Sequence, residues 1–121
     1  MNHMPDVTPD HLTKGKCEPC EGGVDPLTPQ EYAPYLTAVP KWQTEEISGV
    51  TYIVREFTRK NFVDAVDFIQ QITEIAEEEG HHPDLHLTDF KKLRVELTTH
   101  AINGLSVNDF IVAAKIDELE K

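Results

Sequence analysis

The chain has 121 residues and a formal net charge of −11 at pH 7. This length suits one domain with a modest hydrophobic core and is too short for two. The acidic balance argues against direct binding of nucleic acid or of an anionic membrane, because phosphate groups are bound by basic surfaces. The longest apolar run, residues 110–114, is far shorter than a membrane span, and we expect a cytoplasmic protein.

Residues 1–26 predict an irregular N-terminal arm, and residues 27–121 predict a single folded domain. The arm is rich in Pro, Gly, Asp and Thr and has no periodicity. Its Cys17 and Cys20 are spaced as Cys-x-x-Cys, which suits reduced thiols in a turn, half of a zinc site or a redox pair. We favour reduced thiols, because a tetrahedral zinc site needs two more ligands.

The next elements are a short helix and two strands. Thr28 and Pro29 predict the helix start, with threonine as the N-cap and proline in the first helical position. This helix ends before Pro40. A strand begins near Trp42, and residues 51–58 form the next strand after a Ser-Gly turn.

Residues 61–79 are the clearest helix prediction. Apolar side chains recur there at helical spacing: Phe62, Ala65, Val66, Ile69, Ile72 and Ala76. Gly80 is suited to end this helix. Residues 93–97 alternate apolar and polar side chains, which indicates a half-buried strand.

A final helix begins after Ser106, which predicts an N-cap with Asp109 at the third helical position, a variant of the capping box. The helix is apolar on more than one side, which favours a subunit interface: Phe110, Ile111, Ala114, Ile116 and Leu119. The order of elements predicts an α+β fold, an antiparallel sheet of about four strands with helices packed on one face.

Three histidines mark the candidate site. His81 and His82 directly follow the middle helix, and His100 lies beyond the strand of residues 93–97. Imidazole can give or take a proton near neutrality, and the nearby acidic side chains favour its protonated form: Glu74, Glu77, Glu78 and Glu79. If the strand continues that far, parity places His100 on the open face of the sheet, where it would be exposed. The three histidines then converge if the segment after the helix folds over that face.

Other chemistries suit the sequence less well. Neighbouring histidines in a loop tend to point apart, and nothing resembles the His-Glu-x-x-His zinc motif. Ser48 and Ser106 occupy turn and cap positions, so neither suggests a nucleophile. We expect acid–base catalysis by histidine with no metal and no cofactor.

The histidines belong to a longer spaced motif: Glu77, His81, His82, Pro83, Phe90, His100 and Asp109. In this motif the chain resembles the pterin-4a-carbinolamine dehydratases, also known as dimerisation cofactors of a homeodomain transcription factor. Residues 97–100 and 104–106, Trp42 and the Cys-x-x-Cys arm extend the resemblance over roughly residues 17–119. One departure is Leu85, where many members have an aromatic residue; Phe90 supplies the aromatic residue instead.

The resemblance implies dehydration of 4a-hydroxytetrahydropterin (4a-hydroxytetrahydrobiopterin) to quinonoid dihydropterin and water, in tetrahydrobiopterin recycling. By the same resemblance His81 and His100 would transfer protons, and His82 would position the pterin. Supporting roles fall to four other residues: Glu77 and Asp109 would orient the histidines, Pro83 would fix the loop, and Trp42 would line the pocket.

A non-enzymatic role is the alternative. Members of the family that this chain resembles can act as assembly or dimerisation partners of other proteins, which would make the chain a transcriptional coactivator-like binding module. They do so through the helical surface that is otherwise used for self-association. The apolar final helix is compatible with that role and with a homodimer or homotetramer. We place the enzyme first, because a binding module has no need of all three histidines.

Overall fold

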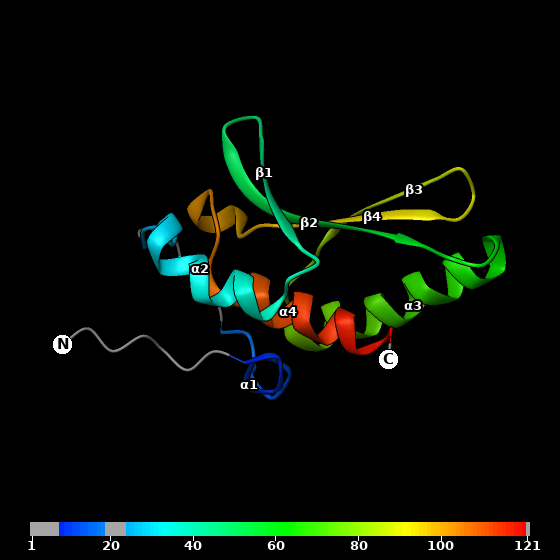
Figure 1. Ribbon diagram of the computed structural model, residues 1–121, viewed down its shortest axis with the longest axis horizontal. Coiled ribbons are helices and arrows are strands. Elements are labelled where there is room, and N and C mark those ends of the chain that lie inside the picture. Colours follow the sequence, from blue (N-terminus) through cyan, green and yellow to red (C-terminus); the bar gives the residue numbers. More distant parts are fainter. Residues whose placement is uncertain (1–7, 19–23, 121) are drawn as a thin grey trace.

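The computed structural model describes residues 8–18 and 24–120 and confirms the α+β prediction. Its antiparallel sheet has the strand order β1-β2-β4-β3, and the helices cover one face of it (Figure 1). The strands are β1 (Gln43–Ile47), β2 (Val50–Thr58), β3 (Asp84–Thr88) and β4 (Lys92–Leu97). The helices are α1 (Pro9–Thr13), α2 (Pro29–Ala38), α3 (Phe62–Glu79), the 3-10 turn η1 (His100–Ile102) and α4 (Val107–Glu118). In the described part of the chain, none of these helices combines the length and the apolar character of a membrane span.

The helix ends follow the local sequence as predicted. Thr28 caps α2 in a capping box with Glu31, and Ser106 caps α4 in a capping box with Asp109. Helix α3 ends at Gly80, whose φ of 64° lies in the left-handed region that glycine enters without steric cost. The turn at Gly80 places the two adjacent histidines directly beyond the helix.

The hydrophobic core lies between the helices and the sheet. Strands β2 and β4 supply one side of it with side chains that are at most 2 % exposed: Ile53, Phe57, Leu93, Val95 and Leu97. Helices α3 and α4 supply the other side, with Phe68, Ile72, Phe110, Val112 and Ile116 at most 1 % exposed. The predicted apolar stripe of α3 and the alternation in β4 are therefore the two surfaces that meet.

Strand β3 is an element that the sequence pattern did not indicate. It has only five residues, and its alternation is confined to Leu85 and Leu87, which pack against the core from a half-buried position. Its pairing with β4 places His86 opposite Arg94. This pairing accounts for the strand, because a segment this short needs a partner to be stable.

The N-terminal arm also differs from the irregular segment that we expected, because residues 9–13 form the short helix α1. Leu12 of this helix is 1 % exposed and joins the core cluster. Figure 1 shows α1 on the side of α4 that faces away from the sheet. A Cβ atom on Gly15 would lie 3.2 Å from the side chain of Ile111, so the arm approaches α4 closely.

This packing changes the interpretation of the final helix. Helix α4 is buried on the sheet side, and the arm of the same chain covers its other apolar side through Leu12. The apolar character of α4 is therefore explained within one chain and gives no separate support for a subunit interface. A homodimer or homotetramer stays a prediction, which the mass in light scattering at micromolar concentration would test.

Candidate active site

A cavity of about 400 Å³ lies where the end of α3, the segment after β4 and the start of α4 meet. Its walls come from four segments of the chain: Cys17 and Glu18, residues 79–82, residues 98–101, and Asn108. His81, His82 and His100 all line this cavity. The structure therefore brings the three histidines to one place.

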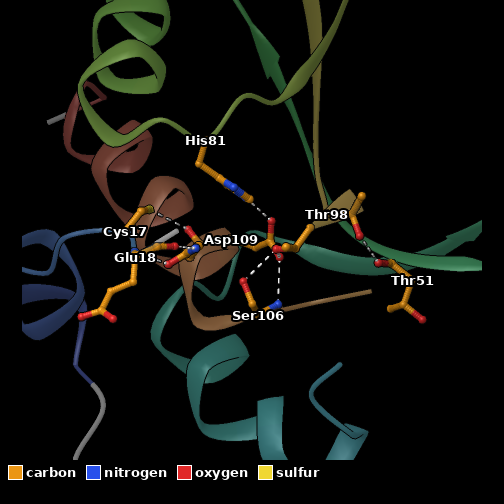
Figure 2. A network of polar contacts seen from close by, with 9 residues as sticks. Cys17, Glu18, Thr51, His81, Thr98, Ser106 and Asp109 are labelled. Carbon is orange, nitrogen blue, oxygen red and sulfur yellow. Dashed lines mark hydrogen bonds and ion pairs between the residues drawn. The ribbon is translucent and has the colours of Figure 1, made fainter. Parts of the chain in front are cut away.

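His81 is paired with the fully buried carboxylate of Asp109. The Nε2 atom of His81 lies 2.6 Å from Oδ1 of Asp109, whose side chain is fully buried. The other oxygen, Oδ2, accepts hydrogen bonds from the backbone N–H of Ser106 at 3.0 Å and from the hydroxyl of Thr99 at 2.8 Å (Figure 2). A carboxylate is an acceptor, so His81 donates its Nε2 proton to Asp109 and presents Nδ1 for proton exchange.

Asp109 combines two functions that the sequence analysis kept apart. As the third residue of α4 it caps the helix through the N–H of Ser106, and a carboxylate there is favoured by the helix dipole. Its second oxygen is left to face His81. One side chain thus ends the helix and orients the imidazole.

His82 has a different partner in a different setting. Its Nε2 lies 2.5 Å from Oε2 of Glu77, on the last turn of α3. The two side chains are 61 % and 70 % exposed, so solvent screens their attraction. This pair can hold the ring of His82 at the mouth of the cavity but adds little to stability.

His100 reaches the cavity from a 3-10 turn. Strand β4 ends at Leu97, Thr99 pairs with Gly104 in an isolated bridge, and His100 begins η1. Its ring stands edge-on to Tyr52, with 6.2 Å between the ring centroids. The assumption behind our parity argument, that the strand continues to His100, is wrong, although the exposure that it predicted for His100 is observed.

Comparison with known proteins adds to this geometry. A family model described as pterin 4 alpha carbinolamine dehydratase matches residues 25–119. This chain belongs to that dehydratase family. The match spans the sheet, α2, α3 and α4, and it begins at residue 25, near the end of the N-terminal arm.

Individual relatives agree with the family model. A candidate pterin-4-alpha-carbinolamine dehydratase of Methylococcus capsulatus is 46% identical over 108 residues, which are 89% of this chain and 92% of that protein. The mitochondrial pterin-4-alpha-carbinolamine dehydratase 2 of Arabidopsis thaliana is 41% identical over 90% of this chain and 59% of its own length. A crystal structure of a transcriptional coactivator/pterin dehydratase from Brucella melitensis is similar with a TM-score of 0.71 and 31% identity, over 80% of this chain and 100% of that one.

Two aromatic residues that carry the family resemblance, Trp42 and Phe90, lie away from the cavity. Trp42 is 2 % exposed and packs on Phe57 in the core, and its Nε1 donates to Asp117 at 2.8 Å. Phe90 is 54 % exposed in the β3–β4 turn, which Figure 1 shows beside the start of α3, far from its end. Neither side chain lines the cavity; Trp42 lies in the core and not at the place that the resemblance implies for it. Pro83 follows His82 and leads into β3.

Glu79 has a role that the sequence pattern did not predict. Its side chain is 1 % exposed, its Oε2 accepts from Nζ of Lys115 at 2.6 Å, and its Oε1 accepts from the backbone N–H of Cys17 at 2.8 Å. The helical spacing of Ile72, Ala76 and Glu79 was the available signal, because it places this glutamate on the buried stripe of α3.

The Glu79 carboxylate predicts a loss of stability in acid. Burial by itself raises the pKa of Glu79, but the hydrogen bonds from Lys115 and Cys17 outweigh it and lower the pKa below its ordinary value of 4.5. The folded state then binds fewer protons than the unfolded state, so this contribution to stability is present above pH 4.5 and is lost as the pH falls through the folded-state pKa.

Urea unfolding at neutral pH and at several pH values below 4.5 tests this prediction. We expect a smaller loss of unfolding free energy on acidification in Glu79→Gln than in the unchanged protein. Glu46→Gln, at an exposed position of β1, is the matched control for removing one charge. Equal acid dependence in Glu79→Gln and the unchanged protein would contradict the assignment.

Cys17 is predicted to be an unreactive thiol. Burial, together with the neighbouring charge of Glu79 and a hydrogen bond to it, raises the pKa of Cys17 from 9.0 to about 12. The thiolate is the reactive form, so alkylation by iodoacetamide should be slower in the folded than in the urea-unfolded protein, on the order of 10³-fold for three pKa units.

Peptide mapping by mass spectrometry in a Cys20→Ser variant measures this rate, because Cys17 is then the only cysteine. Comparable rates in folded and unfolded protein would refute the prediction. Cys20 lies outside the described residues.

Among the residues that the structure describes, no group of three or more His, Cys, Asp or Glu side chains is placed to hold a metal ion.

Proposed function

We propose that the protein dehydrates 4a-hydroxytetrahydropterin to quinonoid dihydropterin and water, in tetrahydrobiopterin recycling. The observation that carries this proposal is one cavity lined by three histidines, with the ring of His81 held by a buried carboxylate. Membership of the dehydratase family supports the choice of a pterin as substrate. The cavity volume of about 400 Å³ lies within the range of small-molecule sites.

The reaction needs one proton donor and one proton acceptor. The bond from C4a to the hydroxyl oxygen breaks, and protonation of that oxygen lets it leave as water. The proton on N5 departs, and its electron pair forms the new double bond to C4a. Because one proton is supplied and one is removed, two imidazoles suffice, and positioned proton transfer of this kind contributes about 10²–10⁴-fold to the rate.

The contacts of the two histidines favour one assignment. With its Nε2 proton donated to Asp109, a neutral His81 offers Nδ1 as the acceptor for the proton of N5. His100 has an exposed ring at the same cavity and is the candidate donor to the leaving hydroxyl. N5 and C4a are neighbouring ring atoms, so both imidazoles must act within one cavity. His82, held by Glu77, would position the pterin.

The direct test is the rate at which the purified protein, treated with chelator, accelerates dehydration of 4a-hydroxytetrahydropterin, followed by absorbance. We expect acceleration well above the spontaneous rate, unchanged by the chelator. A rate equal to the spontaneous one would overturn the proposal. It would also favour the second candidate function, a non-enzymatic binding module. The Brucella melitensis relative supports that candidate, because it is described as a transcriptional coactivator as well as a pterin dehydratase.

A further inference from the structure

Two residues of the N-terminal arm, Cys17 and Glu18, reach the cavity, although they lie before the residues that match the family model. Cys17 and Glu18 line the cavity together with the histidines, whereas the family model begins at residue 25. Figure 2 shows Cys17 and Glu18 on one side of Asp109, with Ser106 and Thr98 on the other. The described end of the arm thus forms a side of the cavity that the matched domain does not supply.

The side-chain amide of Asn108 fastens this part of the arm. Its Oδ1 accepts from the backbone N–H of Glu18 at 3.0 Å, and its Nδ2 donates to the backbone carbonyl of Glu18 at 2.6 Å. An amide that pairs with both main-chain groups of one residue holds the chain as a neighbouring strand would. Because Asn108 is 7 % exposed, little water competes for these hydrogen bonds.

A second fastening lies one residue earlier in the arm. The N–H of Cys17 donates to Glu79, which Lys115 also contacts, and the thiol of Cys17 lies 3.6 Å from the backbone carbonyl of Asn108. Glu79 lies two residues before His81, and Asn108 lies one residue before Asp109. The arm is therefore attached to the two chain segments that carry His81 and Asp109, but through the neighbouring side chain of Glu79 and through Asn108.

We propose that Cys17 and Glu18 form a wall of the substrate cavity and that Asn108 is a positioning residue that holds this wall against the bound pterin. This inference rests on the proposed function. The wall is uncharged at Cys17, because the high pKa of about 12 keeps its thiol protonated. At Cys17 the wall therefore holds the substrate without exchanging protons. It strengthens binding of the ground state and the transition state alike, which affects KM and leaves kcat nearly unchanged.

The first test is the Asn108→Ala variant in steady-state dehydration. We expect KM to rise by about tenfold, with kcat within about threefold of the unchanged protein, the pattern of lost uniform binding. Asn61→Ala is the matched control, because Asn61 also holds a backbone N–H, that of Asp64 at 2.8 Å, at the other end of α3. The control should keep its KM, and thermal unfolding of both variants shows whether each is folded.

The second test needs no substitution in the site. Trypsin cleaves after the exposed Lys14 and Lys16 only when the arm detaches, and a ligand that contacts the arm must slow that detachment. We expect 7,8-dihydropterin to protect these two bonds in the unchanged protein, and to protect them less in Asn108→Ala.

An active protein whose arm gains no protection from 7,8-dihydropterin would overturn this inference while leaving the proposed function intact. An unchanged KM in folded Asn108→Ala would overturn it as well. If the unchanged protein shows no dehydratase activity, the proposed function itself fails, so the two failures are distinguishable.

Discussion

Replacing His81 by alanine is expected to lower kcat for dehydration by about 10²–10⁴-fold and to change KM little. His81 is the histidine whose ring a buried carboxylate orients, at 2.6 Å from Asp109. Its loss removes the proton acceptor but leaves most of the cavity wall in place. The measurement is steady-state dehydration followed by absorbance, corrected for the spontaneous reaction.

His86→Ala is the matched control for this experiment. His86 also meets a carboxylate, with its Nε2 3.1 Å from Oε1 of Glu96, but it lies on β3 and does not line the cavity. We expect His86→Ala to keep kcat within about twofold of the unchanged protein. If His81→Ala kept full activity and His100→Ala lost it, proton transfer would depend on His100 alone and our assignment would be wrong.

Replacing Asp109 by alanine is expected to lower the free energy of unfolding by about 3–5 kcal/mol, because each buried polar group that is left without its hydrogen-bond partner costs about 1–3 kcal/mol. The side chain is fully buried, and its removal leaves the N–H of Ser106, the hydroxyl of Thr99 and the ring of His81 without their acceptor. Activity should fall in parallel, because the orientation of His81 is lost.

Asp109→Asn separates these two effects. The amide oxygen can still accept from Ser106 and Thr99, so most of the stability should remain. Its NH₂ group would face Nε2 of His81, which must then carry a lone pair, and the ring proton moves to Nδ1. That tautomer cannot accept a proton from substrate, so we expect kcat to fall as far as in His81→Ala.

Urea unfolding and steady-state kinetics on both Asp109 variants measure these effects. Glu77→Ala is the control, because its pair with His82 is exposed and should contribute little to stability. A fully active Asp109→Asn variant would show that Asp109 only caps α4. Equal loss of unfolding free energy in Asp109→Ala and Glu77→Ala would show that burial does not make the His81–Asp109 contact more stabilising than the exposed His82–Glu77 contact.

Local sequence patterns predicted the long elements well, because their boundaries depend on residues that are neighbours along the chain. Thr28 and Ser106 each form a capping box with the acidic residue three positions later, and Gly80 ends α3. The missed elements, α1 and β3, have five residues each. Short segments like these carry weak periodicity, and they become ordered through contacts with α4 and β4 that no local pattern contains.

The amino-acid sequence already shows which side chains are available at the candidate site and that two of its histidines follow a helix end. The partners of these histidines depend on how the chain folds. Asp109 meets His81 across 28 residues of chain, whereas the glutamates next to His81 pair elsewhere: Glu77 with His82 and Glu79 with Lys115.

The identity of the residues that line the cavity also depends on the tertiary structure. The family resemblance implied Trp42 as a pocket residue, but its side chain lies in the core, and the aromatic residue of the motif, Phe90, lies in an exposed turn. The arm residues Cys17 and Glu18 line the cavity instead. The physical reason is that such contacts depend on how α3, α4 and the arm pack together, and burial of the whole core sets that packing.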